Sequence, residues 1–490
     1  MRILIVDCLA RGGSGRLATV DVIGVGPRLV AGILESKGLN VKIVPFEEFI
    51  KFRDERLAKY DLLLVSGMSS DEKCVGITLE KWRRVRKYAI IGGPIAFGYV
   101  EGSKDVMEDV IIVCGEGEKT VDELFNHIVD EGVEILSDVE LLKNIKGLIF
   151  KTHDDIVFTG FPEHPSSTEL DSYMPSTRRV KDYPQYWACR VYVEVVRGCS
   201  NFRRPSIKLP DGRKCINCSN CFKAKPLSLR LKCPLDIPAG CGYCSIPQLY
   251  GPPRSRSVNV IVKEIFELLD LGVTRIVLSA ADFLDYGRDE LVKPQPLTDP
   301  TWPPPNLDRI EELLSTLTAH EAFRKGKAVL SIENLKANLV DEEVARLLGK
   351  YLKGTTVHIG CETGSEKQAL EVGRPVTPRD VVRAVKLLKR YGLRPYVYFI
   401  HGLPGQKIEY VKETVNIMRE LEKVGVEKIT TYRFTPLPLT AFSKFPRGKP
   451  YVKDKLSRMI VLEAKRINLK YKMELVNSSI PCVIVRPYYK

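Results

Sequence analysis

Val195-Val196-Arg197-Gly198-Cys199 and Cys241-Gly242-Tyr243-Cys244 begin and end a stretch that holds seven of the 13 cysteines of this 490-residue chain. We call residues 199–244 the cysteine belt. In a reducing compartment, cysteines packed this closely are more often thiolate ligands of iron or zinc than disulfides. The first residues show no secretory leader, and nowhere do about 18 uncharged apolar residues run together. We therefore expect a cytoplasmic protein without a membrane span, and metal chemistry in the belt.

The charge of the chain is uneven. It carries 75 Lys and Arg residues against 61 Asp and Glu residues, a formal net charge of +14. Half of that excess falls between residues 200 and 240, where nine basic residues accompany two acidic ones. Such a surface suits nucleic acid or an acidic protein partner. The many Lys, Arg and Glu residues beside few Gln residues are typical of heat-adapted proteins.

The N-terminal part, residues 1–135, alternates short apolar runs with helical stretches. Glycines follow or flank several of these runs, where a strand-to-helix turn lets the backbone approach a ligand. This rhythm predicts an α/β fold, a doubly wound Rossmann-like parallel sheet. A connector, residues 136–189, carries a predicted hairpin of residues 147–151 and 156–159. The predicted strands of the sheet are residues 3–6, 41–45, 62–66, 89–91 and 110–113.

A second series of six strand and helix pairs occupies residues 190–440. It predicts a partial (β/α)6 TIM-like barrel, in which active groups cluster at the carboxyl ends of the strands. Cys199 comes three residues after the first predicted strand, so its position favours a functional role. We expect residues 441–490 to cap the barrel with a helix over 453–471 and a strand near 483–485. The predicted barrel strands are residues 192–196, 275–278, 328–332, 356–359, 396–400 and 428–434, and the first helix between them is residues 258–271.

The two ends of the cysteine belt resemble the cluster loop of the radical S-adenosylmethionine (radical SAM) enzymes. The resemblance implies that Cys199, Cys241 and Cys244 hold a [4Fe–4S] cluster, whose open iron binds SAM and cleaves it to a 5′-deoxyadenosyl radical. That family usually places three residues between its first two cysteines, whereas 41 intervene here. Either Cys199 or Cys233 could supply the first thiolate. We favour Cys199, because it ends a strand and carries the Arg-Gly context.

The inserted part of the belt, residues 200–240, has a cysteine pattern of its own. Two residues lie between Cys215 and Cys218 and two between Cys218 and Cys221, and Cys233-Pro234 follows. This spacing resembles a ferredoxin-type ligand set and implies a second [4Fe–4S] cluster. The alternative is a zinc knuckle, because thiolates at these spacings also suit tetrahedral zinc.

Three further stretches are similar to those of cobalamin-dependent radical SAM enzymes, and we expect each at a strand end. They are residues 251–257, 360–365 and 399–406. By resemblance, Tyr243 backs the adenine of SAM, Ser279 and Asp282 approach its methionine part, and Glu333 or Glu362 holds the ribose. Each of the two glutamates could equally be an ordinary carboxylate of the barrel mouth.

The N-terminal domain is similar to the cobalamin-binding domain of that subgroup. The similarity lies in Ser66-Gly67-Met68, Gly92-Gly93-Pro94 and residues 114–118, and implies that Ser66, Gly92 and Gly93 contact cobalamin. No histidine precedes His127, so we expect no histidine ligand below a corrinoid from this domain. A degenerate domain that serves as a lid or substrate platform is the alternative.

Scattered cysteines and histidines give weaker signals. Cys8, Cys74 and Cys114 lie at or soon after predicted strands and could meet at one sheet edge, as a methylthiotransferase cluster would require, although buried thiols are common. His358 and His401 should end barrel strands and could exchange protons with a substrate. Cys361 is a candidate hydrogen-atom donor or a buried thiol.

These features together predict a radical SAM enzyme, most simply a cobalamin-dependent methyltransferase that works at an unactivated carbon. The second cluster would relay electrons from an acidic ferredoxin or flavodoxin that docks on the basic insertion. One alternative is an RNA-modifying enzyme of the methylthiotransferase kind, whose insertion grips RNA. Another is a zinc-dependent nucleic-acid-binding protein without catalysis. No motif specifies the substrate.

Overall fold

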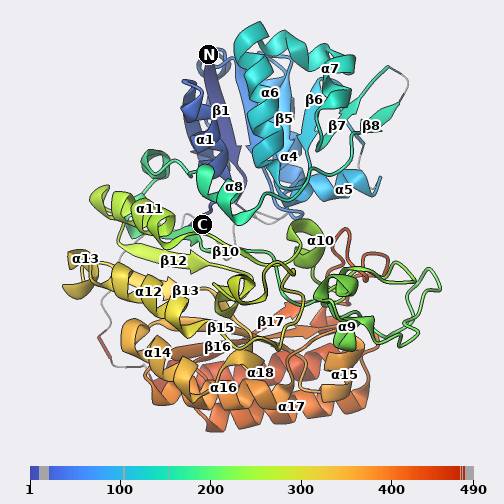
Figure 1. Cartoon of the computed structure of the whole chain (residues 1–490), viewed down its shortest axis with the longest axis vertical. Helices are drawn as coiled ribbons and strands as arrows, with labels where there is room; N and C mark the ends of the chain where they lie inside the picture. The colour runs from blue at the N-terminus through green and yellow to red at the C-terminus, as the bar shows by residue number, and fades with distance from the viewer. Residues whose placement is uncertain (10–20, 103–104, 154, 475, 477, 480–490) are drawn as a thin grey trace. The chain divides into compact units, whose positions relative to one another are not determined.

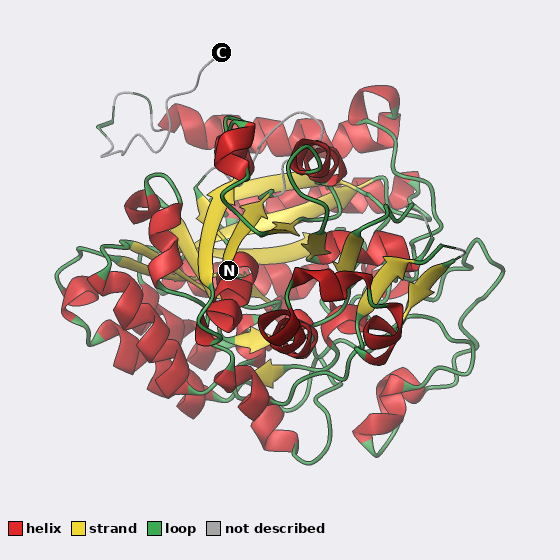
Figure 2. Ribbon diagram, turned by 90° about the horizontal axis from the view of Figure 1, so that it is seen from above, coloured by secondary structure: helices red, strands yellow, loops and turns green. Residues whose placement is uncertain are grey.

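The computed structural model describes residues 1–9, 21–102, 105–153, 155–474, 476 and 478–479. The predicted strand near 483–485 lies outside these residues. Contacts divide the described chain into two compact units: unit 1 contains residues 1–193 and 259–276, and unit 2 lies within residues 194–258 and 277–482. Figure 2 shows helices and strands interspersed with long loops, which confirms the predicted α/β class.

Unit 1 is built on a seven-stranded sheet of order β3-β1-β4-β5-β6-β7-β8. Its first five members are parallel: β1 (Arg2–Asp7), β3 (Asn40–Pro45), β4 (Leu62–Ser66), β5 (Ala89–Gly92) and β6 (Val110–Val113). The hairpin β7 (Leu148–Lys151) and β8 (Ile156–Phe158) adds antiparallel strands. All of these strands were predicted, because nearly continuous apolar runs are typical of parallel strands covered on both faces.

The strand order of unit 1 creates a crevice at one edge of the sheet. The chain moves from β1 outward to β3 and then returns past β1 to β4. Because such crossovers are right-handed, α1 (Gly26–Ser36) and α4 (Glu72–Trp82) cover opposite faces. Helix α6 (Gly117–Glu131) packs beside α1 (Figure 1). Ligands of doubly wound sheets bind at the carboxyl ends of the strands where the order reverses, here β1 and β4.

Unit 1 includes one helix from far along the chain, α11 (Val258–Asp270). Arg28 of α1, which is fully buried, forms an ion pair of 2.9 Å with Glu264 of α11 and donates to the carbonyl of Tyr192. Thr177 donates to Glu267 on the same helix. The sequence predicted this helix as the first helix of the barrel, whereas its contacts group it with the doubly wound sheet.

Unit 2 carries the later strands of the predicted barrel. The strands β14 (Asn334–Leu335), β15 (Thr356–Glu362), β16 (Arg394–His401) and β17 (Lys428–Arg433) form one parallel sheet in that order. The strands β12 (Arg275–Ser279) and β13 (Val329–Ile332) precede them along the chain. The alternating helices are α12 (Leu307–Thr318), α14 (Glu342–Leu352), α16 (Pro378–Arg390) and α17 (Ile408–Lys423). These pairs confirm the predicted partial barrel.

The last described helix, α18 (Lys455–Glu474), covers the edge of the final barrel strand. It packs on α17 and β17. Asn468 accepts a hydrogen bond from the backbone N–H of Ile429 at 2.9 Å and donates to the carbonyl of the same residue at 2.6 Å. This side chain therefore takes the place of a neighbouring strand beside β17, which blunts an exposed sheet edge.

Two predicted positions differ from the structure. Residues 251–257 do not end a barrel strand, because they enter β11 (Arg254–Ser255), which pairs antiparallel with β10 (Val196–Arg197). His358 is the third residue of β15 rather than its end, since that strand continues to Glu362. The other two stretches do end strands, β15 and β16.

Short elements connect these parts. Within the described residues, no helix is both long and apolar enough to span a membrane. The short elements of unit 1 are β2 (Val22–Ile23), α2 (Phe46–Phe49), α3 (Asp54–Leu57), α5 (Phe97–Val100), α7 (Val139–Asn144) and α8 (Ser167–Ser172). Strand β9 is Arg190–Glu194. The short helices of unit 2 are α9 (Asn220–Lys223), α10 (Ile246–Tyr250), α13 (Glu321–Arg324) and α15 (Glu366–Glu371).

Candidate active site

The two ends of the cysteine belt meet in unit 2. Cys199 follows β10 through Gly198, whose φ of 96° and close approach to the carbonyl of Pro252 leave no room for a side chain. The N–H of Cys199 then donates to the carbonyl of Gly251 at 3.1 Å. The antiparallel pairing of β10 with β11 therefore brings the segment before Cys199 back beside the segment that follows Cys244.

Asn201 connects Cys199 with Cys241. Its backbone N–H points to the sulfur of Cys199 at 3.4 Å, and its side-chain amide donates to the sulfur of Cys241 at 3.3 Å. The same amide donates to the carbonyl of Gly373 at 3.0 Å, and the residue is 2% exposed. One buried residue, through its backbone N–H and its side-chain amide, thus links two cysteines that 41 residues separate in the sequence.

Cys244 completes a group of three thiols with Cys199 and Cys241. The N–H of Cys244 donates to the carbonyl of Cys241 at 2.9 Å in a tight turn before α10. Burial raises the pKa of Cys199 to about 11 and that of Cys244 to about 12, and charge on Cys241 acts in the same direction on both. Buried thiols lose their protons readily when a metal replaces the proton. This donor set fits an iron cluster with three protein ligands.

Tyr243, between the last two cysteines, belongs to a buried ionic group. Arg374 donates to the Tyr243 hydroxyl at 3.0 Å and to the carbonyl of Gly360, and it lies 3.6 Å from a carboxylate oxygen of Glu362. Glu362 ends β15 with a left-handed φ of 65°, next to a bulge in the strand pairing. Burial raises the pKa of Glu362, and the charge of Arg374 opposes that rise. Two predicted SAM contacts, Tyr243 and Glu362, therefore share Arg374, which the sequence did not single out.

The remaining predicted SAM contacts follow β12 and β13. Ser279 ends β12 and donates to Glu333 at 2.9 Å, so these two side chains lie together. Asp282 is fully buried and faces Lys336, with an ion pair of 3.1 Å and a hydrogen bond from the Lys336 N–H. The carboxylate of Asp282 thus fixes the segment after β14, and Ser279 and Glu333 form the more accessible pair.

Lys336 also reaches the residue that follows Cys199. Its ammonium donates to Ser200 at 2.8 Å and to Asp285 at 2.7 Å. Asp285 accepts from the hydroxyl of Ser200 at 2.9 Å and forms an ion pair with Arg288. Burial raises the pKa of the Asp285 carboxyl, but the charges of Lys336 and Arg288 outweigh it and hold the pKa below its usual value. This buried network immobilises the backbone around Cys199.

The insertion, residues 200–240, consists mainly of loops around the short helix α9 of unit 2 (Figure 1). Cys221 lies in α9, and charge on Cys215 and Cys218 acts on its thiol. Cys215 and Cys233 pack on one apolar cluster, and Cys218 is exposed. In the described part of the chain, no three Cys, His, Asp or Glu side chains gather at the spacing of a single-ion site. A [4Fe–4S] cluster requires a wider spacing of its ligands than a single ion does, since each thiolate binds a different iron.

Two arginines lie near the cysteines of the insertion, and one of them also lies near the group formed by Cys199, Cys241 and Cys244. Arg204 is buried and donates to the sulfur of Cys221 at 3.2 Å, and also to the backbone carbonyls of Ile237 and Leu231. Arg203 lies over the ring of Phe222 at 4.9 Å, and burial lowers its pKa although charge on both Cys241 and Cys221 raises it. Its guanidinium therefore lies within electrostatic range of both cysteine groups.

The predicted cobalamin contacts lie together at the carboxyl edge of unit 1. Ser66 ends β4 and Gly92 ends β5. Gly93 has a φ of 90°, and a side chain on it would meet the carbonyl of Gly67 at 2.7 Å, whereas a side chain on Gly92 would meet open space. A flat cofactor fits an edge where backbone is bare in this way.

Unit 1 brings one unpredicted histidine to its sheet. His164 lies beyond the predicted domain end at residue 135, and its Nδ1 is 2.6 Å from the carboxylate of Glu116, which follows β6. A histidine oriented by a carboxylate is a common arrangement around metal ligands. Glu116 belongs to the stretch 114–118 that the sequence singled out, but no local pattern connected it with His164, because the two residues are 48 positions apart.

Cys8, Cys74 and Cys114 of unit 1 do not meet. Cys8 follows β1 and Cys114 follows β6, with β4 and β5 between those strands. Three strand spacings separate them by roughly 14 Å. Cys74 lies within α4 rather than after a strand. The alternative in which these three thiols meet at one sheet edge is therefore not supported, and all three are buried, as the other interpretation expects.

The two barrel histidines differ in setting. His358 stacks on Tyr396 with ring centroids 5.8 Å apart and meets Tyr398 edge to face. His401 does end β16 and is 5% exposed, and burial together with the charge of Arg433 lowers its pKa. Cys361 is buried and points its thiol at the carbonyl of Thr363.

Comparison with known proteins identifies the class. The Radical SAM superfamily profile matches residues 231–418. A protein of Methanocaldococcus jannaschii, uncharacterized protein MJ1620, is 42% identical over 491 residues, which span 100% of this chain and 90% of that protein. The chain therefore belongs to the radical SAM superfamily, which implies an enzyme that uses SAM and a [4Fe–4S] cluster.

Two solved structures share the fold. One is the radical SAM methyltransferase TsrM of Kitasatospora setae, solved with tryptophan and a SAM analogue, with a TM-score of 0.61, 15% identity and coverage of 90% of this chain and 75% of that one. The other is the cobalamin-dependent radical SAM enzyme OxsB with aqua-cobalamin, with a TM-score of 0.56, 13% identity and coverage of 85% and 52%. A tRNA-2-methylthio-N(6)-dimethylallyladenosine synthase of Sulfurihydrogenibium is 23% identical over 48% of this chain and 51% of its own length.

Proposed function

We propose that this chain is a cobalamin-dependent radical SAM methyltransferase that acts at an unactivated carbon. The observation that carries the proposal is Asn201, which hydrogen-bonds to both Cys199 and Cys241. It favours Cys199 over Cys233 as the first ligand, because Asn201 links Cys199 to Cys241 and charge on Cys199 raises the pKa of the Cys244 thiol. The likeness in fold to TsrM and OxsB supports a methyl donor in the sheet unit.

The side chains of unit 2 have separable tasks in this reaction. When bound, the cluster reduces SAM to methionine and a 5′-deoxyadenosyl radical, and methylcobalamin supplies the methyl group. Arg374 holds the Tyr243 ring and the Glu362 carboxylate in fixed positions beside the cysteines. Glu333, oriented by Ser279, offers a second carboxylate for ribose hydroxyls. Lys336 and Asp285 keep the Cys199 segment rigid.

In unit 1, the corresponding task is to hold cobalamin. Ser66, Gly92 and Gly93 offer a bare backbone edge for the corrin ring. No histidine of residues 1–126 is present to ligate cobalt from below. Corrinoid binding is measured by the absorption spectrum of protein reconstituted with hydroxocobalamin. A variant in which Gly93 becomes Val should lose binding, because the side chain would strike the carbonyl of Gly67.

Metal and product analysis tests the two cluster sites together. After anaerobic reconstitution, about eight irons per chain and 5′-deoxyadenosine formation from SAM are expected. Cys241→Ala should abolish 5′-deoxyadenosine formation, whereas Cys221→Ala should remove roughly half the iron. Cys189→Ala, a buried cysteine of unit 1, is the matched control and should change neither. Zinc in place of iron, or product formation by Cys241→Ala, would falsify the assignment.

The insertion supports an acidic ferredoxin or flavodoxin as electron donor. Exposed Lys223, Lys225 and Lys232 surround α9, with Phe222 and Ile216 also exposed. Charge complementarity accelerates such docking and weakens with salt. Reduction by flavodoxin should slow when the three lysines become Glu, whereas reduction by dithionite should not. Equal slowing with both reductants would argue against docking at this surface.

An RNA-modifying enzyme is the second candidate. The observation in its favour is the likeness of nearly half the chain to the tRNA methylthio synthase. A methylthio transfer would add sulfur as well as carbon to its product. Mass analysis of total tRNA treated with reconstituted enzyme and SAM therefore separates the two: a gain of one methyl group supports methyl transfer, and a gain of a methylthio group supports the second candidate.

A further inference from the structure

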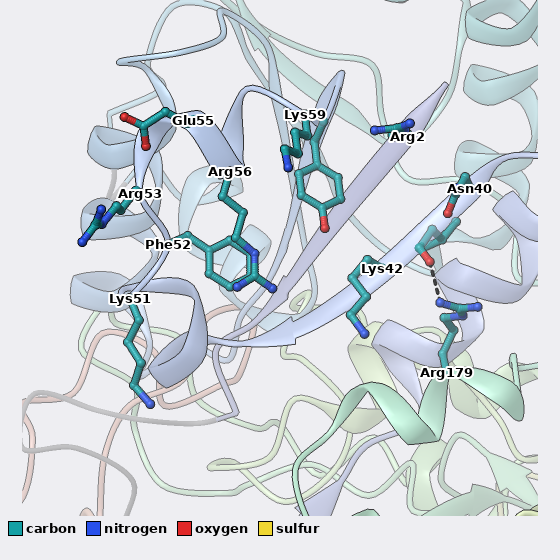
Figure 3. Close-up of a pocket in the computed structure, with 12 residues that line it drawn as sticks. Arg2, Asn40, Lys42, Lys51, Phe52, Arg53, Glu55, Arg56, Lys59 and Arg179 are labelled. Atoms are coloured by element: carbon teal, nitrogen blue, oxygen red, sulfur yellow. Dashed lines mark hydrogen bonds between the residues drawn. The ribbon is translucent and has the colours of Figure 1, made fainter.

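Unit 1 contains a strongly basic hollow far from the cysteine belt in the sequence. It measures about 730 Å³ and lies beside the amino-terminal ends of β1 and β3 (Figure 3). Among its lining residues one carboxylate, Glu55, accompanies seven cations. The cations are Arg2, Lys42, Lys51, Arg53, Arg56, Lys59 and Arg179.

Some of these cations are neutralised and others are not. Lys42 pairs with Asp182, Lys51 with Glu48, and Arg179 with Glu35. No ion pair in the described part of the chain involves Arg53, Arg56 or Lys59. Arg56 lies over the ring of Phe52 at 3.6 Å, which orients its guanidinium without satisfying its charge (Figure 3). Within the described residues, Arg53, Arg56 and Lys59 are therefore cations without an ion-pair partner on and around α3, where Asp54 and Glu55 offset part of their charge.

A second basic hollow of about 720 Å³ adjoins the first. It is lined by Arg83, Arg84, Arg86, Lys87 and Lys151, with Glu108 and Asp109 as its carboxylates. Arg86 donates to the carbonyls of Ala58 and Tyr60, and Tyr60 lines the first hollow. The two hollows therefore lie next to each other, and together they offer twelve cations against three carboxylates. We call this surface the basic edge.

The basic edge is not explained by the helix ends near it. Helix α4 ends at Trp82, and a helix carboxyl end carries roughly half a negative charge. That half charge offsets only a small part of the four cations at residues 83, 84, 86 and 87. The edge also lies at the opposite ends of the strands from Ser66 and Gly92, so the predicted cofactor does not account for it.

We propose that the basic edge binds the phosphodiester backbone of a polynucleotide. Seven of its twelve cations are arginines, whose planar forks match phosphate oxygens. Two hollows in succession suit an extended chain of charges better than a single small anion. The half-buried Tyr60 gives aromatic surface on which a base can stack, whereas the ring of Phe52 is buried beneath Arg56. The inference goes beyond the proposed function, because it requires neither cluster nor cobalamin.

The test uses the full chain and fluorescently labelled 20-nucleotide RNA and DNA of one sequence, with anisotropy measured at several salt concentrations. Arg53→Ala/Arg56→Ala/Lys59→Ala should lower affinity at 0.1 M salt by at least about tenfold and reduce the salt slope by about 2, since each phosphate contact on a single strand contributes roughly 0.7. All three side chains are exposed, so the fold should persist, and a thermal melt checks it. Preference for RNA or equal binding of DNA identifies the source of the backbone, and either supports the proposal.

The matched control removes three exposed lysines of the insertion, Lys214→Ala/Lys223→Ala/Lys232→Ala. It should bind as the unaltered chain does. Affinity lost in this control but kept in the α3 variant would place the polynucleotide on the insertion and overturn the proposal. Absence of binding at 0.1 M salt, or equally tight binding of labelled polyglutamate or inorganic triphosphate, would overturn it as well.

Discussion

Single hydrogen bonds to sulfur distinguish the two cysteine groups. In the group of Cys199, Cys241 and Cys244, the neutral side-chain amide of Asn201 donates a hydrogen bond to the sulfur of Cys241. In the insertion, the cationic guanidinium of Arg204 donates to the sulfur of Cys221. Donors to cluster ligands stabilise the more negative, reduced form and raise the reduction potential. A charged donor does so about twice as strongly as a neutral one. The SAM cluster and the proposed second cluster of the insertion should therefore respond to different residues.

The first prediction concerns Arg204→Met. Removal of a charged hydrogen bond worth about 1.5–3 kcal/mol should lower the potential of the proposed insertion cluster by at most roughly 65–130 mV. The belt cluster should not move. Redox titration followed by electron paramagnetic resonance resolves the two signals. Asn201→Ala is the reciprocal control, with a drop of roughly 20–60 mV confined to the belt cluster; a shift of both clusters by either variant would contradict this separation.

The second prediction concerns Asp285→Asn, which leaves Lys336 and Arg288 buried beside a neutral side chain. Loss of one partner from a buried ionic group should cost about 3–5 kcal/mol of unfolding free energy. Urea denaturation measures it, with Glu343→Gln on the exposed face of α14 as the control. An effect below about 1 kcal/mol would show that the network contributes little.

The same carboxyl predicts an acid response. Its folded pKa is lower than its unfolded value of about 3.9, so its stabilising effect is fully present above that pH. The effect is lost as pH falls through the lower folded value. The stability difference between the native chain and Asp285→Asn should therefore shrink below about pH 4.

At the scale of elements, the sequence predicted every described strand longer than two residues, and missed the two-residue strands β2, β10, β11 and β14. The runs at residues 62–66 and 110–113 are continuous and apolar, a pattern that few other structures explain. Asn201 and Arg374 were missed because neither belongs to a local pattern: each acts on a partner 40 or 131 residues away. His358 was misplaced because β15 continues through Gly360 and a bulge, where the apolar run had already ended.

The third prediction concerns the edge of β17. Asn468→Ala on α18 removes both hydrogen bonds to Ile429 and should cost about 1–3 kcal/mol. Hydrogen exchange of the peptide that contains β17 should accelerate, because its edge amide becomes exposed. Lys472→Ala on the same helix is the control. Unchanged exchange in the Asn468 variant would mean that apolar packing of α18 suffices to cover the edge.

At the scale of the whole molecule, unit 1 is discontinuous. Arg28 and Glu264 are 236 residues apart, yet their ion pair is fully buried within this one unit. The sequence predicted a helix at residues 258–271 but not the unit on which it packs. Amphipathic periodicity indicates which face of a helix is buried, and not which element covers that face. The net charge of the chain did not reveal the basic edge either, because the cations of the basic edge and those of the insertion both contribute to that one total.

The fourth prediction follows from that discontinuity. A fragment of residues 1–193 should be much less stable than the same region in the full chain, because Arg28 would be buried without Glu264. Limited proteolysis of both measures the difference. In the full chain, Glu264→Gln should cost about 3–5 kcal/mol, whereas Arg28→Met/Glu264→Leu should cost less. A fragment as resistant as the full chain would exclude a structural need for α11.

The order of synthesis gives this discontinuity a further meaning. Unit 1 cannot close until Ile276 has left the ribosome, about 80 residues after Val193. At about 5–20 residues per second, this leaves an interval of roughly 4–16 s. All seven belt cysteines emerge within that interval. Iron delivery, or oxidation of the thiols, therefore competes with the folding of a unit to which these cysteines do not belong.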